Sequence, residues 1–258
     1  MERPLLGSRS RLSGFTLKRI AIVSMLIDHI GSVVIDGVVA PYRTAEGFLF
    51  TADMPFLVKY SMYIRDVCEA LGSVAFPIFC FLIAEGFLHT RDRVKYGLRL
   101  GLFALLSEIP YDLAHYQSLW SFRLQNVLFT LCVGVFTLVV LGLAERRFTG
   151  WSVGRVGLTL LIAAAGMGLA FLLRGEYVFL GVAAIVLLYL LRDAGWFRLL
   201  GFAPLLVASP WILLALIPVV LYSGQRGRGS KYFFYVFYPA HFLVLAGLAW
   251  LLAQRAVS

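Results

Sequence analysis

Long apolar runs alternate with short polar connections along the whole chain. Such runs predict helices that lie in a lipid bilayer, because about 20 helical residues cross its roughly 30 Å of hydrocarbon. The runs 196–208 and 210–222 are one apolar stretch divided at Ser209-Pro210, where proline favours a turn. The full set of runs is 17–36, 66–88, 94–114, 124–143, 156–173, 177–191, 196–208, 210–222 and 232–253. We therefore predict an all-α, polytopic transmembrane helical bundle of about nine spans, with eight or ten as alternatives.

Composition agrees with this pattern. The 258 residues are 60% hydrophobic and only 14% charged, with a mean hydropathy of +0.86. A water-soluble globule of this size would have too few charged residues to cover its surface. The predicted helices leave no room for a separate soluble domain, so we expect a single integral membrane domain over residues 1–258. Any chemistry must then use side chains of the spans and their short loops.

The basic residues occupy every second connection between the predicted helices. These clusters run from Arg9 to Arg19, Arg91 to Lys95, Arg146 to Arg155, Arg192 to Arg198 and Arg226 to Lys231. Short cytoplasmic loops of membrane proteins keep Lys and Arg, whereas translocated loops lose them. We therefore expect a multi-pass protein of the bacterial cytoplasmic (inner) membrane with a cytoplasmic N-terminus. The net charge of +9 is explained by these loops, and no nucleic-acid partner is expected.

Two ionisable residues, Asp28 and His29, lie inside the first predicted helix. An ionisable group at this depth costs roughly 2.5–3.5 kcal/mol on insertion scales, so it requires a partner or a task. Neighbouring positions on a helix point about 100° apart, so the two side chains must address different helices. An imidazole can accept and return a proton near neutral pH, which suits a general base. The alternative is that both residues are polar packing partners between helices.

A carboxylate in the second predicted helix has two interpretations. Glu85 and His89 are four residues apart and share one face of that helix. The pair can line a cavity for substrate. Alternatively, Glu85 forms an ion pair with Arg91 or a neighbouring Lys at the membrane interface.

The third and fourth predicted helices carry a further polar group. Glu108 and Asp112 are four residues apart, and Gln125 and Asn126 open the next helix. Glu108 lies deep enough to favour a role as a catalytic or acceptor-site carboxylate. An ion pair with Arg123 would explain Asp112, and the two amides are either hydrogen-bond donors into the same space or polar helix-terminal residues.

A glycine-rich basic loop, residues 224–231, precedes the last predicted helix. Backbone N–H groups and guanidinium groups of such a loop can bind phosphates. Arg91, Lys95 and Arg99 are spaced by four and would form a second basic stripe on the same side of the membrane. The alternative is ordinary cytoplasmic positive charge in contact with anionic lipid.

These motifs together resemble the TraX family. The motifs are Leu17-Lys18-Arg19, Leu26-Ile27-Asp28-His29-Ile30-Gly31, Phe76-Pro77-Ile78-Phe79 with Glu85-Gly86-Phe87, Ser107-Glu108-Ile109-Pro110-Tyr111-Asp112, Gln125-Asn126-Val127-Leu128-Phe129-Thr130, and Arg226-Gly227 through Tyr238-Pro239-Ala240-His241. They extend over nearly the whole chain. The family's named member acetylates the N-terminus of F-type pilin during conjugation, and the family is similar to the transmembrane acyltransferases that modify sugars and cell-wall polymers. The resemblance therefore implies acetyl-CoA, or another acyl-CoA, as donor.

The resemblance also implies roles for individual residues. In the related acyltransferases an essential histidine on an early helix follows a basic residue by about three turns. Here Lys18 stands eleven residues before His29 where the family pattern has Arg, so Lys18 or Arg19 would take that place. Glu85, Glu108, Asn126 and His241 carry over as motif residues only.

We therefore expect an acetyl-CoA-dependent transmembrane acetyltransferase whose acceptor is an amine or hydroxyl of a protein, peptide or glycan, and no metal is expected. The alternative is a proton-coupled transporter, which also places carboxylates and histidines in its spans but usually has inverted repeats that are not found here. The expected catalytic residues are His29, Asp28 and Glu108, and the expected substrate or cavity residues are Glu85, Asp112, Gln125 and Asn126. The expected donor-binding residues are Lys18, Arg19, Arg91, Arg93, Lys95, Arg226, Arg228, Lys231, Tyr238 and His241.

Overall fold

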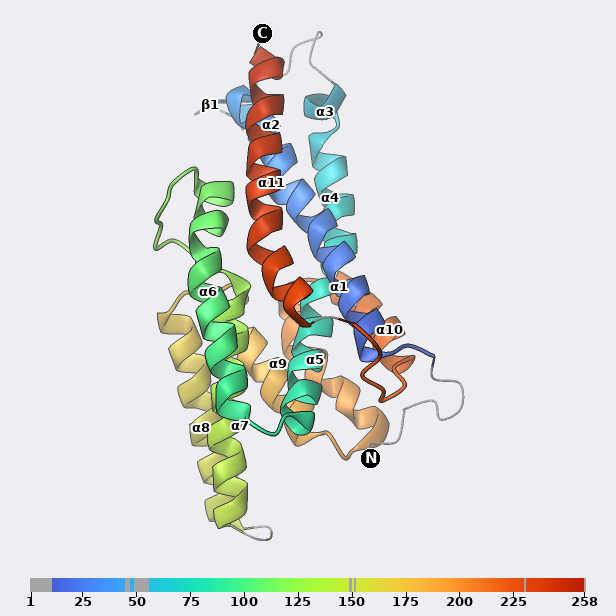
Figure 1. Cartoon of the computed structure of the whole chain (residues 1–258), viewed down its shortest axis with the longest axis vertical. Helices are drawn as coiled ribbons and strands as arrows, with labels where there is room; N and C mark the ends of the chain where they lie inside the picture. Colours follow the sequence, from blue (N-terminus) through green and yellow to red (C-terminus); the bar gives the residue numbers. More distant parts are fainter. Residues whose placement is uncertain are drawn as a thin grey trace.

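The structure is a computed structural model that describes residues 11–44, 47–48, 56–148, 150, 152–229 and 231–257. Within these ranges the chain is almost entirely helical, and its long helices run along the long axis of the molecule (Figure 1). The two-residue strands β1 (Arg43–Thr44) and β2 (Gly47–Phe48) form one short antiparallel pair near the C-terminal end. The predicted all-α transmembrane class is confirmed.

The helices follow one another in order along the chain. They are α1 (Gly14–His29), the π-helix η2 (Ile30–Ile35), α2 (Asp36–Val39), the 3-10 helix η3 (Ala40–Tyr42), α3 (Phe56–Lys59), α4 (Ser61–Gly72), α5 (Ala75–His89), α6 (Arg93–Tyr116), α7 (Val127–Arg147), α8 (Val153–Leu172), α9 (Val178–Leu190), the 3-10 helices η4 (Gly195–Val207) and η5 (Pro210–Ala215), α10 (Leu216–Val220) and α11 (Lys231–Val257).

Five helical segments of the described chain are long and apolar enough to cross a membrane. They are Gly14–Tyr42, Ser61–His89, Val127–Arg147, Val153–Leu172 and Phe233–Gln254, and three shorter apolar helices cover Val178–Leu190, Gly195–Val207 and Pro210–Val220. The 24-residue α6 is as long as these spans but carries charged residues toward both ends. Every predicted apolar run therefore appears as helix, while the shorter runs fall below the length of a full α-helical span.

Two predicted elements differ from the structure in kind. The run 66–88 consists of two helices, because the chain breaks between Gly72 and Ala75. The Ser24 hydroxyl on α1 donates to the carbonyls of Leu71 (2.5 Å) and Gly72 (3.0 Å) and so satisfies acceptors that the break releases. The run 196–208 forms the 3-10 helix η4, whose rise of about 2.0 Å per residue gives its 13 residues a length of about 26 Å.

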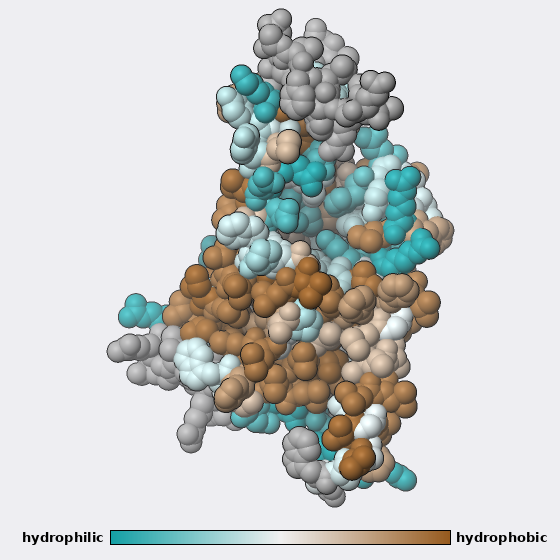
Figure 2. Space-filling view, turned by 180° about the vertical axis from the view of Figure 1, so that it is seen from behind, coloured by the Kyte–Doolittle hydropathy of each residue, from teal (hydrophilic) through white to brown (hydrophobic). Residues whose placement is uncertain are grey.

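The surface of the molecule shows how it fits a bilayer. A band of apolar residues crosses the middle of the face in Figure 2, and polar residues lie above and below it. Large apolar side chains on the outer faces of α6, α8 and α11 contribute to the exposed surface, as Leu105, Leu161 and Val244 do, with more than half of each accessible. Such extensive apolar exposure is expected where lipid is the solvent.

The basic connections gather at one end of the molecule. Figure 1 places the start of α1 and the α5–α6, α7–α8 and α9–η4 connections in its lower part, whereas β1, α3 and the C-terminus lie at the top. The loop before α11 reaches the same lower part, because the Gly14 and Phe15 N–H groups donate to the carbonyls of Gln225 (2.7 Å) and Arg226 (2.9 Å). One end of the bundle is therefore basic, as the alternation of charge predicts.

Glycines allow the central helices to approach closely. A Cβ at Gly181 of α9 would lie 2.6 Å from both the Phe76 ring and the Thr130 methyl group. The Phe76 ring cannot move aside easily, because it stacks on Tyr177 with 3.8 Å between ring centroids. Small residues play this part at many contacts between membrane helices.

The first prediction concerns this packing. Gly181→Ala should destabilise the protein by about 1–3 kcal/mol, because the added methyl overpacks the contact with Phe76 and Thr130. The measurement is the midpoint of thermal unfolding in detergent. Gly157→Ala is the control: a Cβ there meets nothing within 4 Å, so its midpoint should equal or exceed that of the native protein. Equal midpoints for the two variants would contradict the described packing of α9.

Candidate active site

His29 lies at a change in helix type halfway along the first span. It is the last residue of α1, and the π-helix η2 begins at Ile30 within the 29-residue segment Gly14–Tyr42. Single π-helical turns inside α-helices are frequent at functional sites. Close packing accompanies the change, because a Cβ at Gly31 would lie 2.7 Å from Cys68 Cβ on α4. The His29 side chain is buried, with 5% of its surface accessible.

The partner of His29 is a second histidine from the far end of the chain. His29 Nδ1 lies 2.7 Å from His241 Nε2 on α11, and the two rings stack with 5.0 Å between centroids. The other nitrogen of His241, Nδ1, lies 3.2 Å from the Phe237 carbonyl one turn earlier. His241 was expected at the donor-binding end, but the structure places it against His29 and also buries it.

A third histidine, His115 on α6, completes the cluster. Its ring meets the His29 ring edge to face at 5.9 Å and lies 4.4 Å from the Tyr111 ring. Its Nδ1 is 3.2 Å from the Tyr111 carbonyl. His115 is not among the predicted site residues, although it continues the polar stripe of Glu108 and Asp112 by one more turn of helix.

Phe242 of α11 packs against all three imidazoles. Its ring centroid lies 4.6 Å from that of His29, 4.1 Å from that of His241 and 5.4 Å from that of His115. Phe242 is fully buried. The three imidazoles therefore lie against an apolar side chain. The hydrogen bond between His29 and His241 is strong there, because little water competes for it.

Asp28 faces a different part of the bundle, as its position beside His29 predicts. It packs against the break between α4 and α5, where a Cβ at Gly72 would lie 2.5 Å from Asp28 Oδ1. Its neighbourhood also contains the ion pair between Arg65 and Asp36, at 2.8 Å. Asp28 is thus placed beside the end of α4 that adjoins α5 and is separated from the His29–His241 contact.

Glu108 belongs to a buried polar group between α6, α7 and α11. Its Oε2 accepts hydrogen bonds from the backbone N–H of Asn126 (3.3 Å) and from the Asn126 side chain. Asn126 in turn donates to the Ala104 carbonyl (2.8 Å) and caps α7 by accepting from Leu128 N–H (3.1 Å). Asn126 therefore both begins a helix and holds one oxygen of Glu108.

Asp112 and Gln125 hold the loop between α6 and α7. Asp112 Oδ2 accepts from the Ser121 N–H at 2.6 Å, and Gln125 Nε2 donates to the Ser121 carbonyl at 3.2 Å. The Arg123 guanidinium, which the sequence offered as a partner for Asp112, lies over the Tyr116 ring at 5.8 Å. These two residues are explained by loop structure.

Several buried polar atoms near Glu108 make no hydrogen bond within the described part of the chain. They are Ser107 Oγ, Glu108 Oε1 and Asp112 Oδ1, and beside them the Tyr238 hydroxyl faces the backbone N–H of Val127. Tyr238 is three residues before His241 on α11 and lies within electrostatic reach of Glu108. Because an unsatisfied buried polar atom is costly, such a group is suited to receive a polar ligand or water.

At the basic end, Lys18 and Arg226 lie together. The Lys18 ammonium is over the Phe234 ring at 5.4 Å, and Arg226 is close enough to interact with it electrostatically. Arg226, Arg228 and Arg19 are exposed. The side chain of Lys231, another expected phosphate ligand, lies outside the described residues.

The second basic group lies at the start of α6. A surface depression of about 450 Å³ is lined by Thr90, Asp92, Lys95, Leu98, Arg99 and Leu102. Asp92 caps α6 by accepting from the Lys95 N–H (3.0 Å), and this hydrogen bond holds the pKa of its carboxyl below the usual value. Tyr235 on α11 is close enough to interact electrostatically with Arg99, so the first turns of α11 lie between the two basic groups.

Arg93 has a structural role in place of the expected ligand role. Its Nε donates to the Phe87 carbonyl at 3.2 Å, and its guanidinium lies over the Phe87 ring at 4.4 Å. These contacts join the start of α6 to the end of α5. Arg91, two residues earlier, is exposed.

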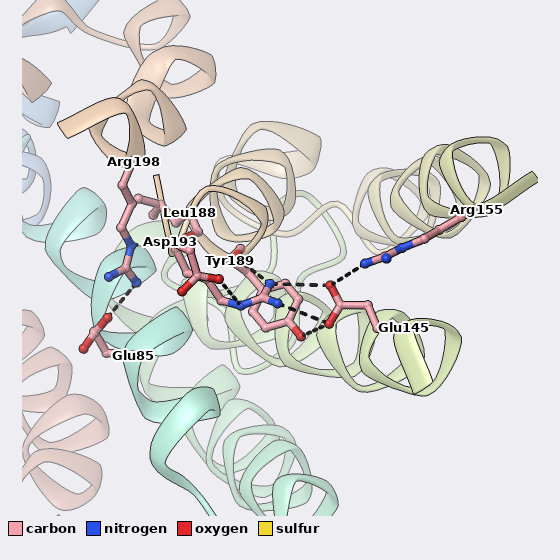
Figure 3. A network of polar contacts seen from close by, with 8 residues as sticks. Glu85, Glu145, Arg155, Leu188, Tyr189, Asp193 and Arg198 are labelled. Carbon is pink, nitrogen blue, oxygen red and sulfur yellow. Dashed lines mark hydrogen bonds and ion pairs between the residues drawn. The ribbon is translucent and has the colours of Figure 1, made fainter. Parts of the chain in front are cut away.

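Glu85 forms a buried ion pair with a residue other than its predicted partners. Its Oε1 lies 2.6 Å from Nη2 of Arg198 on η4, and both side chains are almost fully buried (Figure 3). Arg198 Nε also donates to the Leu188 carbonyl at 3.2 Å, and its guanidinium covers the Phe81 ring at 4.8 Å. Glu85 therefore joins α5 to η4 and α9.

Glu145 of α7 forms a second polar network beside this pair, with residues of α8 and α9. It accepts from the Tyr189 hydroxyl at 2.8 Å and forms ion pairs with Arg192 (3.4 Å) and Arg155 (3.8 Å) (Figure 3). These arginines of the basic end thus stabilise α7, α8 and α9. Among the described residues, no group of three or more His, Cys, Asp or Glu side chains is arranged to hold a metal ion.

Comparisons with known proteins identify related sequences. Residues 13–249 match the family described as TraX protein. The chain is 28% identical over 263 residues to the probable fimbrial assembly protein FimC, serogroup H1, of Dichelobacter nodosus, and the match covers 90% of this chain and 94% of that protein. No solved structure matches.

The second prediction concerns the buried ion pair. Arg198→Met should destabilise the protein by about 3–5 kcal/mol, because the Glu85 carboxylate then stays buried without this guanidinium. The double variant Glu85→Gln/Arg198→Met should recover much of the loss. The measurement is thermal unfolding in detergent, with Arg147→Met, an exposed position at the same end, as control. A single variant as stable as the control would show that the pair does not hold η4 in place.

Proposed function

The chain belongs to the TraX family, and from this premise we propose that it is a membrane-embedded acetyltransferase that transfers an acetyl group from acetyl-CoA to an acceptor amine or hydroxyl. The observation that carries the proposal is the buried His29, held at mid-span by a hydrogen bond from one ring nitrogen to His241. A histidine oriented through one nitrogen leaves its other nitrogen available as a general base.

The reaction uses that second nitrogen. The acceptor nitrogen or oxygen attacks the thioester carbonyl carbon, a new C–N or C–O bond forms, and the C–S bond breaks. His29 Nε2 takes the proton that the acceptor loses, and the departing CoA thiolate takes a proton back to leave as the thiol. The net change is one acetyl group moved and one proton exchanged.

The donor enters at the basic end of the bundle. The exposed Arg226 and Arg228 of the loop before α11, with Lys18 behind them, form the main phosphate site. Lys95 and Arg91 contribute from the other side of α11. Arg93 is not included, because its guanidinium is held on Phe87. The positive-inside rule places this end in the cytoplasm, where acetyl-CoA is made, and the membrane is then the bacterial inner membrane.

The acceptor binds beside Glu108. The Oε1 oxygen of that carboxylate and the Ser107 hydroxyl offer polar contacts that the described part of the protein leaves unused, and the Tyr238 hydroxyl lies near them. A carboxylate among hydroxyls suits an amine, which can donate to all three. Because a relative is named a fimbrial assembly protein, the terminal amine of a fimbrial or pilus subunit is the acceptor we favour, with a sugar hydroxyl as the second choice.

The third prediction tests His29. His29→Gln should lower acetyl transfer by roughly 100-fold or more, because the general base is lost while the donor site remains. The measurement is incorporation of labelled acetyl from acetyl-CoA into membranes of cells that lack the native gene and carry each variant. His89→Gln is the matched control, since His89 Nδ1 hydrogen-bonds to the Glu85 carbonyl of its own helix and lies outside the cluster. Unchanged transfer in His29→Gln would remove the histidine from the mechanism.

The fourth prediction tests the donor site. CoA should raise the thermal unfolding midpoint of the purified protein, and Arg226→Ala/Arg228→Ala should lower the affinity by roughly tenfold or more, because charge-assisted contacts to phosphate are lost. Arg146→Ala/Arg147→Ala, two exposed arginines at the same end, should leave the shift unchanged. No shift with CoA in the native protein would favour a proton-coupled transporter over an acetyltransferase.

A further inference from the structure

We propose that His29 and His241 form a two-histidine proton relay in which His241 fixes the tautomer of His29 and takes over its proton during the reaction. The inference deepens the proposed function, on which its catalytic part rests. It assigns His241 as a positioning residue that acts through His29. The hydrogen-bond pattern itself is independent of what the protein acetylates.

The direction of the hydrogen bonds follows from the Phe237 carbonyl. A carbonyl oxygen only accepts, so His241 Nδ1, at 3.2 Å from it, must carry the proton. A neutral imidazole holds one proton, and His241 Nε2 is therefore an acceptor. His29 Nδ1, at 2.7 Å, must then donate to it. The remaining nitrogen of neutral His29, Nε2, is left with the lone pair.

The resting arrangement therefore presents a base without a buried charge. Both imidazoles are neutral, which suits a site where Phe242 and Phe237 cover the rings. An aspartate in the place of His241 would orient His29 equally well but would add an ionised group to this apolar surrounding. Asp28, the adjacent carboxylate, is instead directed to Gly72 on the far side of α1.

The reacting arrangement follows from one proton shift. When His29 Nε2 takes the proton of the acceptor, the Nδ1 proton moves along the 2.7 Å hydrogen bond to His241 Nε2. His241 becomes the imidazolium, with Nδ1 still bonded to the Phe237 carbonyl, and His29 stays neutral with its proton now on Nε2. The reverse shift delivers that proton to the CoA thiolate, so both histidines return to their first state.

The helices packed around the pair add few other titratable groups. Within the described residues, His115 on α6 and Tyr238 on α11 contact the pair, and Tyr111 on α6 contacts His115 and Phe242 beside it. His115 Nδ1 donates to the Tyr111 carbonyl, so its Nε2 also carries a lone pair, and Asp36 is within electrostatic reach of its ring. His115 meets the His29 ring edge to face, with 5.9 Å between ring centroids, and so contacts His29 without taking the place of His241 on Nδ1, which makes His115 a matched comparison for His241.

The fifth prediction is read by NMR, which does not depend on activity. The chain has four histidines, so a sample labelled with ¹⁵N-histidine gives few signals, and one variant for each assigns them. The native protein should show His29 with a proton on Nδ1 and none on Nε2, and a scalar coupling across the bond from His29 Nδ1 to His241 Nε2. His241→Gln should abolish the coupling and keep the His29 tautomer, because a glutamine oxygen can accept the same proton. His241→Leu should leave His29 in a mixture of tautomers.

Acetyl transfer by the His241 variants tests the proton relay separately from the proposed acetyltransferase function. His241→Gln, which orients but cannot take the proton, should lower acetyl transfer by roughly tenfold or more, and His241→Leu should lower it further, while the CoA-induced thermal shift stays unchanged. His115→Gln should retain more transfer than His241→Gln.

Two results would overturn the relay. One is a resting His29 with its proton on Nε2. The other is undiminished transfer in both His241 variants, which would leave the acetyltransferase assignment standing. If the native protein transfers no acetyl group, the proposed function fails while the tautomers still test the hydrogen bond.

Discussion

Hydrocarbon cannot hydrogen-bond, so every polar group placed among the helices must find its partner inside the protein. This constraint explains most contacts around the site. Ser24 satisfies carbonyls at the break between α4 and α5, Asn126 both caps α7 and holds Glu108, and Arg198 neutralises Glu85. The atoms left unsatisfied beside Glu108 depart from this constraint within the described part of the chain, and they are the atoms that a polar ligand or water can satisfy.

The sequence predicts the helices well because apolar periodicity and length are local properties. It also places His29 at mid-span and predicts that the His29 and Asp28 side chains point in different directions. Both predictions need only the geometry of one helix. The break after Gly72 was not predicted, because the hydroxyl that satisfies its carbonyls is on α1. The 3-10 form of η4 was likewise not predicted, since composition does not distinguish it from an α-helix.

Partners across the bundle are what the sequence could not supply. Neighbours along the chain suggested Arg91 for Glu85 and Arg123 for Asp112, whereas the structure pairs these carboxylates with Arg198 and with the Ser121 N–H. His241 was assigned to the donor end because it follows the basic loop, yet three turns of α11 carry it to the level of His29. His115 was within reach of prediction, because it extends the stripe of Glu108 and Asp112 by one turn.

The two histidines that meet in the bilayer are 212 residues apart in the chain. The first two N–H groups of α1, those of Gly14 and Phe15, donate to the carbonyls of Gln225 and Arg226. During synthesis, α1 leaves the ribosome long before α11 does. A nascent or truncated chain therefore lacks the pair altogether, and His29 stays without its His241 partner until the last helix has been inserted.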